Sequence, residues 1–137
     1  METIEISQNE TDAQFIREKI NEYNFNRVPH DNHQVLNLIA REQNIIIGGL
    51  IGDTAWNWLY ISLFWVDERK RSLGLGTRIL AMAEELAVQR DCRHANLETH
   101  DFQSLNFYQK RGYVVFGQLE DFPDGHTKYY LWKNLMR

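Results

Sequence analysis

The sequence predicts a single α/β (α+β) domain over residues 1–137. With 137 residues, of which 43% are hydrophobic and 12% aromatic, the chain is long enough to bury one ordinary core. Runs rich in β-branched and aromatic residues occur together with two amphipathic helical patterns, which is typical of mixed folds. The sequence contains no internal repeat, low-complexity tract or linker at which a second domain would begin.

The N-terminal half is predicted to hold a strand, a helix and a three-stranded meander. Apolar and polar residues alternate over Thr3–Ser7, which predicts a strand. The following segment, NETDAQFIREKINEYN, has a cap at Thr11 or Asp12 and apolar residues at helical spacing. These apolar residues are Phe15, Ile16, Ile20 and Tyr23. After a polar loop, three β-rich runs start at Gln34 and are separated by turn signals at Gln43-Asn44 and Gly52-Asp53.

The C-terminal half contains the strongest helical pattern, over Leu75–Arg90. Its apolar face comprises Ile79, Leu80, Ala83, Leu86 and Ala87. The segment HANLET is predicted to be a buried strand, and QSLNFYQKR a short helix that ends at Gly112, a residue suited to a left-handed cap. Two last strands, YVVFGQLE and TKYYLWKNL, flank the turn DFPDG.

Composition excludes several classes of protein. The net charge of −4 argues against general binding to nucleic acid or to an anionic membrane. Cys92 is the only cysteine, and neither a signal peptide nor a membrane-spanning stretch is present, so we expect a cytoplasmic protein. His30 and His33 lie three residues apart, but there is no HExxH motif and no cysteine pair, so we expect no metal.

The segment RKRSLGLGTRIL, Arg69–Leu80, places cations and two glycines between a predicted strand and a predicted helix. The first turn of a helix has unpaired backbone N–H groups that bind anions, and glycine allows a ligand to approach closely. A solvated turn remains the alternative. A P-loop is excluded because no lysine follows the second glycine, and a dinucleotide fingerprint is disfavoured because Ile79 stands where its third glycine is required.

Two motifs in order resemble the GNAT superfamily of N-acetyltransferases. RSLGLG, Arg71–Gly76, matches the R/Q-x-x-G-x-G/A signature of that family, and NFYQKRGY, Asn106–Tyr113, resembles its FY-x-K-x-G-F/Y segment about thirty residues later. The tail DFPDGHTKYYLWKNL is similar to that of small single-domain bacterial members. The resemblance implies a mixed, mostly antiparallel sheet of 6–7 strands flanked by about four helices.

The resemblance also implies acetyl-CoA as cosubstrate. Its pyrophosphate would lie on the backbone of Arg71–Thr77, which we call the glycine segment. The residues carried over to this cradle are Arg71, Ser72, Leu73, Gly74, Leu75, Gly76 and Thr77. The pantetheine arm would lie beside the backbone of Phe64, Trp65 and Val66, whose side chains are also core candidates. Arg69, Lys70 and Arg78 are candidates for the 3′-phosphate, or solvated cations.

For the chemistry, the resemblance implies that Tyr108 is the tyrosine that many members place near the sulfur as general acid. The alternative is that Tyr108 only packs the helix on the sheet. Phe107 beside it is assigned to the core. Glu98, His100 and Asp101 are candidates for the base, or turn and surface residues. The chain departs from the family at Asp101, where relatives often carry asparagine seven residues before this tyrosine.

Two classes of function follow from this resemblance. The first is an N-acetyltransferase that transfers acetyl to a primary amine by direct attack on the thioester, and the second is a non-catalytic acyl-CoA sensor of the same fold. We expect a small cationic acceptor, because acidic and aromatic residues lie together near the last turn. These are Glu120, Asp121 and Asp124 with Phe122, Tyr129 and Tyr130. A homodimer is left open.

Overall fold

The computed structural model describes residues 1–136, which fall into two compact units, Met1–His30 and a second unit that begins at Asp31. The first unit contains one helix, α1, Glu10–Phe25. Asn9 caps this helix by accepting a 2.8 Å hydrogen bond from the backbone N–H of Thr11, so the cap lies two residues before the earlier of the two expected positions. The assignment of 1–137 as one domain stays a prediction.

The predicted strand over Thr3–Ser7 is wrong, because residues 1–9 form no strand. Ile4 and Ile6, the apolar half of the alternation, are fully exposed. A period of two shows which side chains share a face, but a strand also needs a neighbour for its backbone hydrogen bonds.

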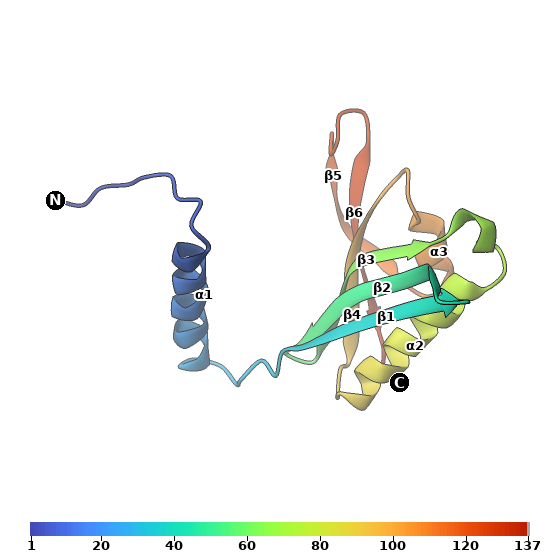
Figure 1. The fold of residues 1–137 in the computed structure, drawn as a ribbon, viewed down its shortest axis with the longest axis horizontal. Helices are drawn as coiled ribbons and strands as arrows, with labels where there is room; N and C mark the ends of the chain where they lie inside the picture. Colours follow the sequence, from blue (N-terminus) through green and yellow to red (C-terminus); the bar gives the residue numbers. More distant parts are fainter. Residues whose placement is uncertain (137) are drawn as a thin grey trace. The chain divides into compact units, whose positions relative to one another are not determined.

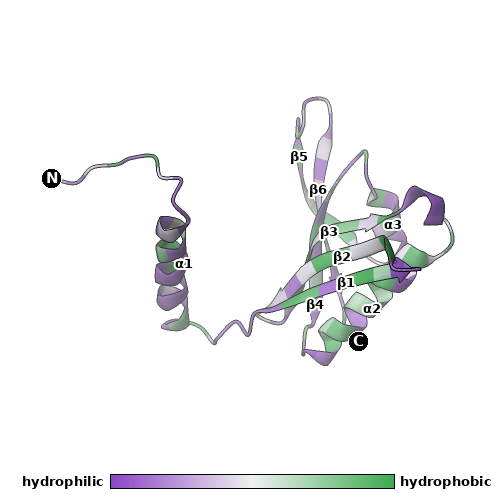
Figure 2. Ribbon diagram, viewed as in Figure 1, coloured by the Kyte–Doolittle hydropathy of each residue, from purple (hydrophilic) through white to green (hydrophobic). Residues whose placement is uncertain are grey.

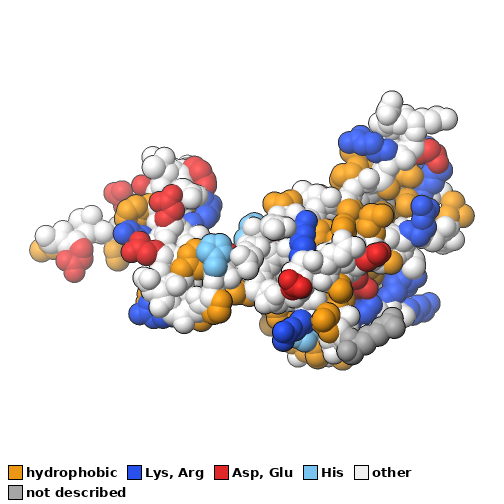
Figure 3. Space-filling view, turned by 90° about the horizontal axis from the view of Figure 1, so that it is seen from below, with side chains coloured by type: hydrophobic (Ala, Val, Ile, Leu, Met, Phe, Trp, Pro, Cys, Tyr) orange, Lys and Arg blue, Asp and Glu red, His pale blue; other side chains and the backbone are white. Residues whose placement is uncertain are grey.

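Helix α1 keeps its predicted apolar stripe exposed. Phe15, Ile16, Ile20 and Tyr23 each expose more than half of their surface, and none of the residues of α1 is buried. Polar residues predominate along the helix (Figure 2). Residues 1–30 hold six acidic and three basic residues, so most of the net negative charge of the chain resides in this unit, as the acidic side chains in Figure 3 illustrate.

The second unit is built on a six-stranded sheet with the order β1-β2-β3-β4-β6-β5 (Figure 1). Its strands are β1 Gln34–Glu42, β2 Ile45–Ala55, β3 Trp58–Val66, β4 His94–His100, β5 Val114–Glu120 and β6 Thr127–Asn134. Within the described residues, β3 and β4 pair in parallel and all other neighbouring pairs are antiparallel. This confirms the mixed, mostly antiparallel sheet and the three-stranded meander.

The second turn of the meander lies four residues later than the sequence predicted. Trp56 and Asn57 form it, both with positive φ, as the tight turns that match the twist of a hairpin require. Gly52 instead lies inside β2, where a Cβ atom would come within 2.4 Å of the carbonyl oxygen of Tyr60. This glycine is therefore needed for close approach of two strands and does not mark a turn.

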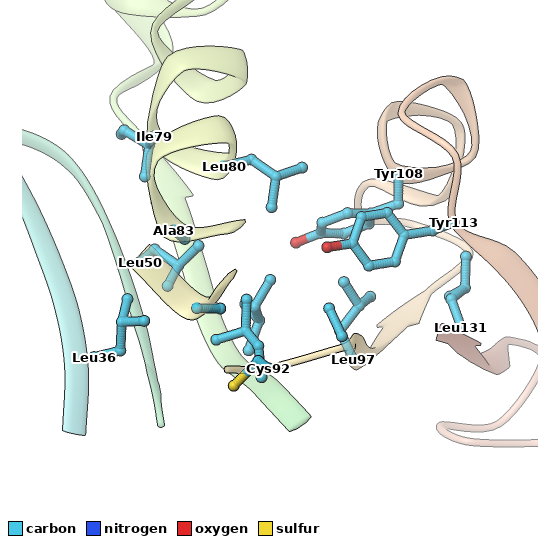
Figure 4. Packing of buried hydrophobic residues seen from close by; sticks show 14 residues of the cluster. Leu36, Leu50, Ile79, Leu80, Ala83, Cys92, Leu97, Tyr108, Tyr113 and Leu131 are labelled. Carbon is cyan, nitrogen blue, oxygen red and sulfur yellow. The ribbon is translucent and has the colours of Figure 1, made fainter. Parts of the chain in front are cut away.

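One face of the sheet is covered by α2, Leu75–Gln89, which connects β3 to β4. Ile79, Leu80, Ala83 and Ala87 are buried, as predicted, and Leu86 is partly buried against them. The helix meets Leu36, Leu50 and Leu97 of the strands, and the rings of Tyr108 and Tyr113 lie side by side near Leu80 (Figure 4). Alternation along the strands turns the neighbouring side chains to the other face of the sheet.

Two short helices complete the second unit. The 3-10 helix η1, Glu68–Lys70, leads from β3 into the glycine segment, and α3, Leu105–Lys110, follows β4. Gly112, with φ of 95°, ends α3 in the expected left-handed conformation. The described chain thus holds three α-helices and one 3-10 helix, in place of about four helices, and no helix in residues 1–136 has the length and apolarity needed to cross a membrane.

Candidate active site

A gap opens in the sheet between β3 and β4. The two strands pair only from Trp58–His94 to Ile61–Leu97, and beyond that point their backbones diverge. At the same level β3 contains a bulge, because Ile51 of β2 faces Leu63 while Gly52 faces Ile61, which leaves Ser62 unpaired. The backbone of β3 from Leu63 onward is therefore bonded to β2 on one side and available on the other.

A cleft of about 1090 Å³ occupies this gap. Its lining combines three groups of residues that the sequence analysis singled out: the end of β3, the glycine segment, and the end of β4 with α3. From these groups it includes Phe64, Trp65, Val66, Arg71, Ser72, Gly74, Gly76, Thr77, Glu98, His100 and Tyr108. The volume is sufficient for an extended small-molecule ligand.

The glycine segment forms the start of α2. Gly74 is the N-cap residue, with φ of 85°, and makes no side-chain cap, so the first backbone N–H groups of the helix have no capping side chain. A Cβ atom on Gly76 would lie 3.5 Å from the ring of Phe107 and 3.6 Å from Val66. This segment thus combines free N–H groups with a closely packed floor, a geometry suited to a phosphate.

Three of the four predicted cations of this segment, Arg69, Lys70 and Arg71, have partners in the protein. Arg69 pairs with Asp67, and Lys70 pairs with Glu42 at 2.9 Å. Arg71 lines the cleft while its Nε donates a 2.9 Å hydrogen bond to the carbonyl oxygen of Val66, which fixes the corner to the end of β3. Their first role in the structure is to shape the loop.

Arg111 is a cleft residue that the sequence analysis missed. Its guanidinium donates to Oγ1 of Thr77 from Nε at 3.1 Å and from Nη2 at 2.5 Å, and it stacks 3.9 Å above the ring of Phe107. It therefore links α3 to the first turn of α2. The signal was its place in NFYQKRGY, directly before Gly112.

Tyr108 lines the cleft and belongs to the core, with 5% of its surface exposed. Its ring lies against those of Phe64, Phe107 and Tyr113. Burial raises the pKa of Tyr108 to about 12, so the phenol is protonated at neutral pH. The position of Tyr108 is therefore compatible with both interpretations of this residue, packing in the core and hydrogen-bond donation in the cleft.

Of the three candidates for the base, Glu98 and His100 line the cleft and Asp101 does not. Oε1 of Glu98 accepts a 3.0 Å hydrogen bond from the hydroxyl of Tyr60, a residue that the sequence analysis also missed. Nδ1 of His100 lies 3.0 Å from Oε1 of Gln103, and its ring stacks on Phe102.

Asp101 joins the end of β4 to the start of β6. Its Oδ1 lies 2.9 Å from Nδ1 of His126, and its Oδ2 accepts the backbone N–H of Thr127 at 3.0 Å. Burial opposes ionisation, but these contacts with Thr127 and His126 outweigh it and lower the pKa of Asp101. One carboxylate oxygen is therefore engaged with the backbone of Thr127 and the other with the side chain of His126.

The acidic residues near the last turn lie away from the cleft lining. Glu120, Asp121 and Asp124 are exposed at the tip of the β5–β6 hairpin. The rings of Phe122 and Tyr130 carry the ammonium of Lys128, at 4.5 and 5.3 Å from their centroids. Lys128 occupies the aromatic surface that we had expected to stack with a cationic acceptor.

Comparisons with known proteins agree with this geometry. Residues 2–113 match the model of the acetyltransferase (GNAT) family. The chain belongs to the GNAT acetyltransferase family. It is 41% identical over 95 residues to a blasticidin-S acetyltransferase of Streptomyces morookaense, a match that covers 69% of this chain and 70% of that protein. It is also 35% identical over 119 residues to an acetyltransferase of Agrobacterium fabrum, covering 86% and 87% of the two chains.

Solved structures of GNAT acetyltransferases share the fold. An acetyltransferase from Bacillus cereus superposes with a TM-score of 0.90 at 29% identity, and covers 97% of both chains. A Bacillus anthracis protein named as a streptothricin acetyltransferase, solved with acetyl coenzyme A, gives a TM-score of 0.66 at 27% identity over 79% of this chain and 64% of its own. The protein is therefore an acetyl-CoA-dependent N-acetyltransferase, which favours the catalytic reading over the sensor.

Proposed function

We propose that this GNAT enzyme transfers acetyl from acetyl-CoA to the primary amine of a small cationic molecule, by direct attack of the amine on the thioester within the cleft between β3 and β4. The observation that carries this proposal is one continuous cleft, lined at one end by the glycine segment and at the other by the carboxylate of Glu98. The names of two relatives, a blasticidin-S and a streptothricin acetyltransferase, support small-molecule acceptors.

The residues fit acetyl-CoA at two points of the cleft. The N–H groups of Leu75, Gly76 and Thr77 form the first turn of α2 and would hold the pyrophosphate. The unpaired edge of β3 at Phe64–Val66 would hydrogen-bond the extended pantetheine arm as a neighbouring strand does. Bound in this way, the cosubstrate supplies a thioester, an acyl group activated toward amines.

The chain supplies a proton acceptor and a hydrogen-bond donor. A primary ammonium must lose a proton before its nitrogen can attack, and Glu98 takes this proton directly or through water. The new C–N bond forms as the C–S bond breaks, and the nitrogen then loses a second proton, which passes through water to the departing sulfur. The hydroxyl of Tyr108 donates a hydrogen bond to that sulfur. A carboxylate in the cleft also favours a positively charged acceptor by Coulomb attraction.

A screen of acceptors tests this proposal. Purified protein with acetyl-CoA is offered blasticidin S, streptothricin and spermidine, together with amides, alcohols and acidic amino acids of similar size, and the released thiol is measured. Cys92 is 1% exposed and contributes little background to a thiol reagent. We expect turnover with cationic primary amines, and acetylation confined to neutral or acidic acceptors would refute the proposed acceptor class.

A further inference from the structure

We propose that Tyr60 is a positioning residue for the acceptor amine: its hydroxyl holds one carboxylate oxygen of Glu98 and thereby leaves the other oxygen, Oε2, to receive the ammonium of the acceptor. The inference rests on the proposed function and adds to it the means by which a primary ammonium is recognised. It assigns to the cleft a two-residue acceptor subsite, Tyr60 with Glu98, built from neighbouring strands.

The parallel register of β3 and β4 brings the two residues together. Tyr60 lies opposite Asn96, and the last paired residues are Ile61 and Leu97, so Glu98 follows the final pair immediately. Leu59, Ile61 and Leu97 are buried in the core, and alternation therefore turns Tyr60 and Glu98 to the opposite face of the sheet. Their hydrogen bond spans the two strands where the ladder ends and the cleft begins.

The direction of this hydrogen bond is fixed by the surroundings of Tyr60. Burial, the hydrogen bond to Glu98 and the charges of Glu98 and Asp53 raise the pKa of Tyr60 to about 12. The phenol is therefore the donor and the carboxylate the acceptor throughout the pH range of an ordinary assay.

The charged and titratable neighbours of the pair come from three strands. Asp53 of β2 lies opposite Tyr60 in register and is itself paired with His33 at 3.1 Å. Tyr130 of β6 lies opposite Glu98, while Lys128 of β6 and His100 of β4 line the same cleft. Within the described residues, Oε1 of Glu98 has Tyr60 as its hydrogen-bond partner, and the structure gives no such partner to Oε2.

This arrangement requires an acceptor with an N–H that can bind Oε2 and a proton that can pass to it. A carboxylate held at one oxygen presents the other in a fixed direction, which suits the N–H of a primary ammonium. The proton that the ammonium loses passes to Oε2, and Tyr60 keeps its own proton throughout.

The test compares Tyr60→Phe with wild type and with Tyr23→Phe, which removes the phenol hydroxyl of an exposed α1 residue outside the cleft lining. Spermidine is the acceptor probe, at saturating acetyl-CoA, and kcat and KM are measured from about pH 5.5 to 9. We expect Tyr60→Phe to raise KM for spermidine about tenfold, the loss typical of a hydrogen bond to a charged group. The value of kcat, the affinity for acetyl-CoA and the behaviour of Tyr23→Phe should stay close to those of wild type.

If the hydrogen bond only joins β3 to β4, Tyr60→Phe would lower the melting temperature and leave the KM for spermidine unchanged, and that result would overturn the inference. Glu98→Asp provides a second variant should Tyr60→Phe fold poorly: the shorter carboxylate withdraws from the phenol, so the same rise in KM is expected, and an unchanged KM counts against the subsite. Wild type without turnover on spermidine or the other cationic amines would refute the proposed function itself. Active wild type with an unaltered Tyr60→Phe would refute only the role of Tyr60.

Discussion

Tyr108→Phe separates the two roles that the structure combines in one side chain. The substitution keeps the ring among Phe64, Phe107 and Tyr113 and removes only the hydroxyl. Packing should therefore survive, and affinity for acetyl-CoA should change by less than about twofold. The expected effects are the loss of the hydrogen-bond donor in the cleft and a weaker dependence of stability on alkaline pH.

The catalytic loss follows from the pKa of the phenol. At about 12 it lies above the value of about 8.5 of an ordinary thiol, so complete transfer of the proton to a thiolate is uphill by about 5 kcal/mol. Tyr108 should therefore act by hydrogen-bonding the departing sulfur as negative charge develops there. We expect the single-turnover rate of Tyr108→Phe to fall by roughly 10²–10⁴, and the rate of wild type to show no decline due to Tyr108 below about pH 11.

The stability loss can be assigned a sign and a size. Below pH 10 the phenol is protonated in both the folded and the unfolded state, and between about pH 10 and 12 the unfolded state ionises first, which lowers the free energy of unfolding. Ionisation of Tyr108 should lower the free energy of unfolding of wild type by roughly 2 kcal/mol between about pH 9 and 11.5. Urea denaturation at the two pH values should show this decrease in wild type and in Tyr129→Phe. In Tyr108→Phe the decrease should be smaller by the contribution of Tyr108. A Phe variant with the single-turnover rate of wild type would assign Tyr108 to the core alone.

Two further substitutions test the glycine segment and the core. At a hundred times its dissociation constant, acetyl-CoA should stabilise wild type by about 2.7 kcal/mol, and Gly76→Glu should abolish this stabilisation. The control Gly117→Glu, on β5 where a Cβ meets nothing within 4 Å, should retain it. Thermal shift measures both, and a shift that persists in Gly76→Glu would show that the glycine segment has a structural role only. Glu84→Ala should lower the free energy of unfolding by about 2–4 kcal/mol. Glu84 accepts hydrogen bonds from Tyr113 at 2.7 Å and from Lys133 at 2.8 Å in a largely buried site. A loss below about 1 kcal/mol, measured by urea denaturation, would contradict this prediction.

Local patterns in the sequence were enough to predict most of the second unit. The core face of α2, the left-handed cap at Gly112 and the Gln43-Asn44 turn all depend on residues within a few positions of one another. The errors arose where a local pattern had two explanations. Gly52 resembled a turn residue, but the approach of Tyr60 from the next strand explains it, and that contact depends on strand register.

The site shows the same division between local and distant information. The glycine segment and Tyr108 lie in short motifs that the sequence reveals directly. The partnership of Tyr60 with Glu98 joins residues 38 positions apart, and that of Thr77 with Arg111 joins residues 34 apart. Such pairs depend on the parallel register of β3 and β4 and on the packing of α3 against α2. Neither of these can be read from a single sequence.

The splay between β3 and β4 explains how one cleft can contain both the proposed base and the proposed hydrogen-bond donor. Tyr108 belongs to the core on the face of the sheet that α2 covers, whereas Glu98 lies on the opposite face with Tyr60. A fully paired sheet would separate these groups by a layer of backbone. Because pairing stops after Ile61 and Leu97, the cleft is lined by residues of both faces. In the proposed reaction, the hydroxyl of Tyr108 and the carboxylate of Glu98 would therefore approach one thioester from two sides, and neither can take the place of the other.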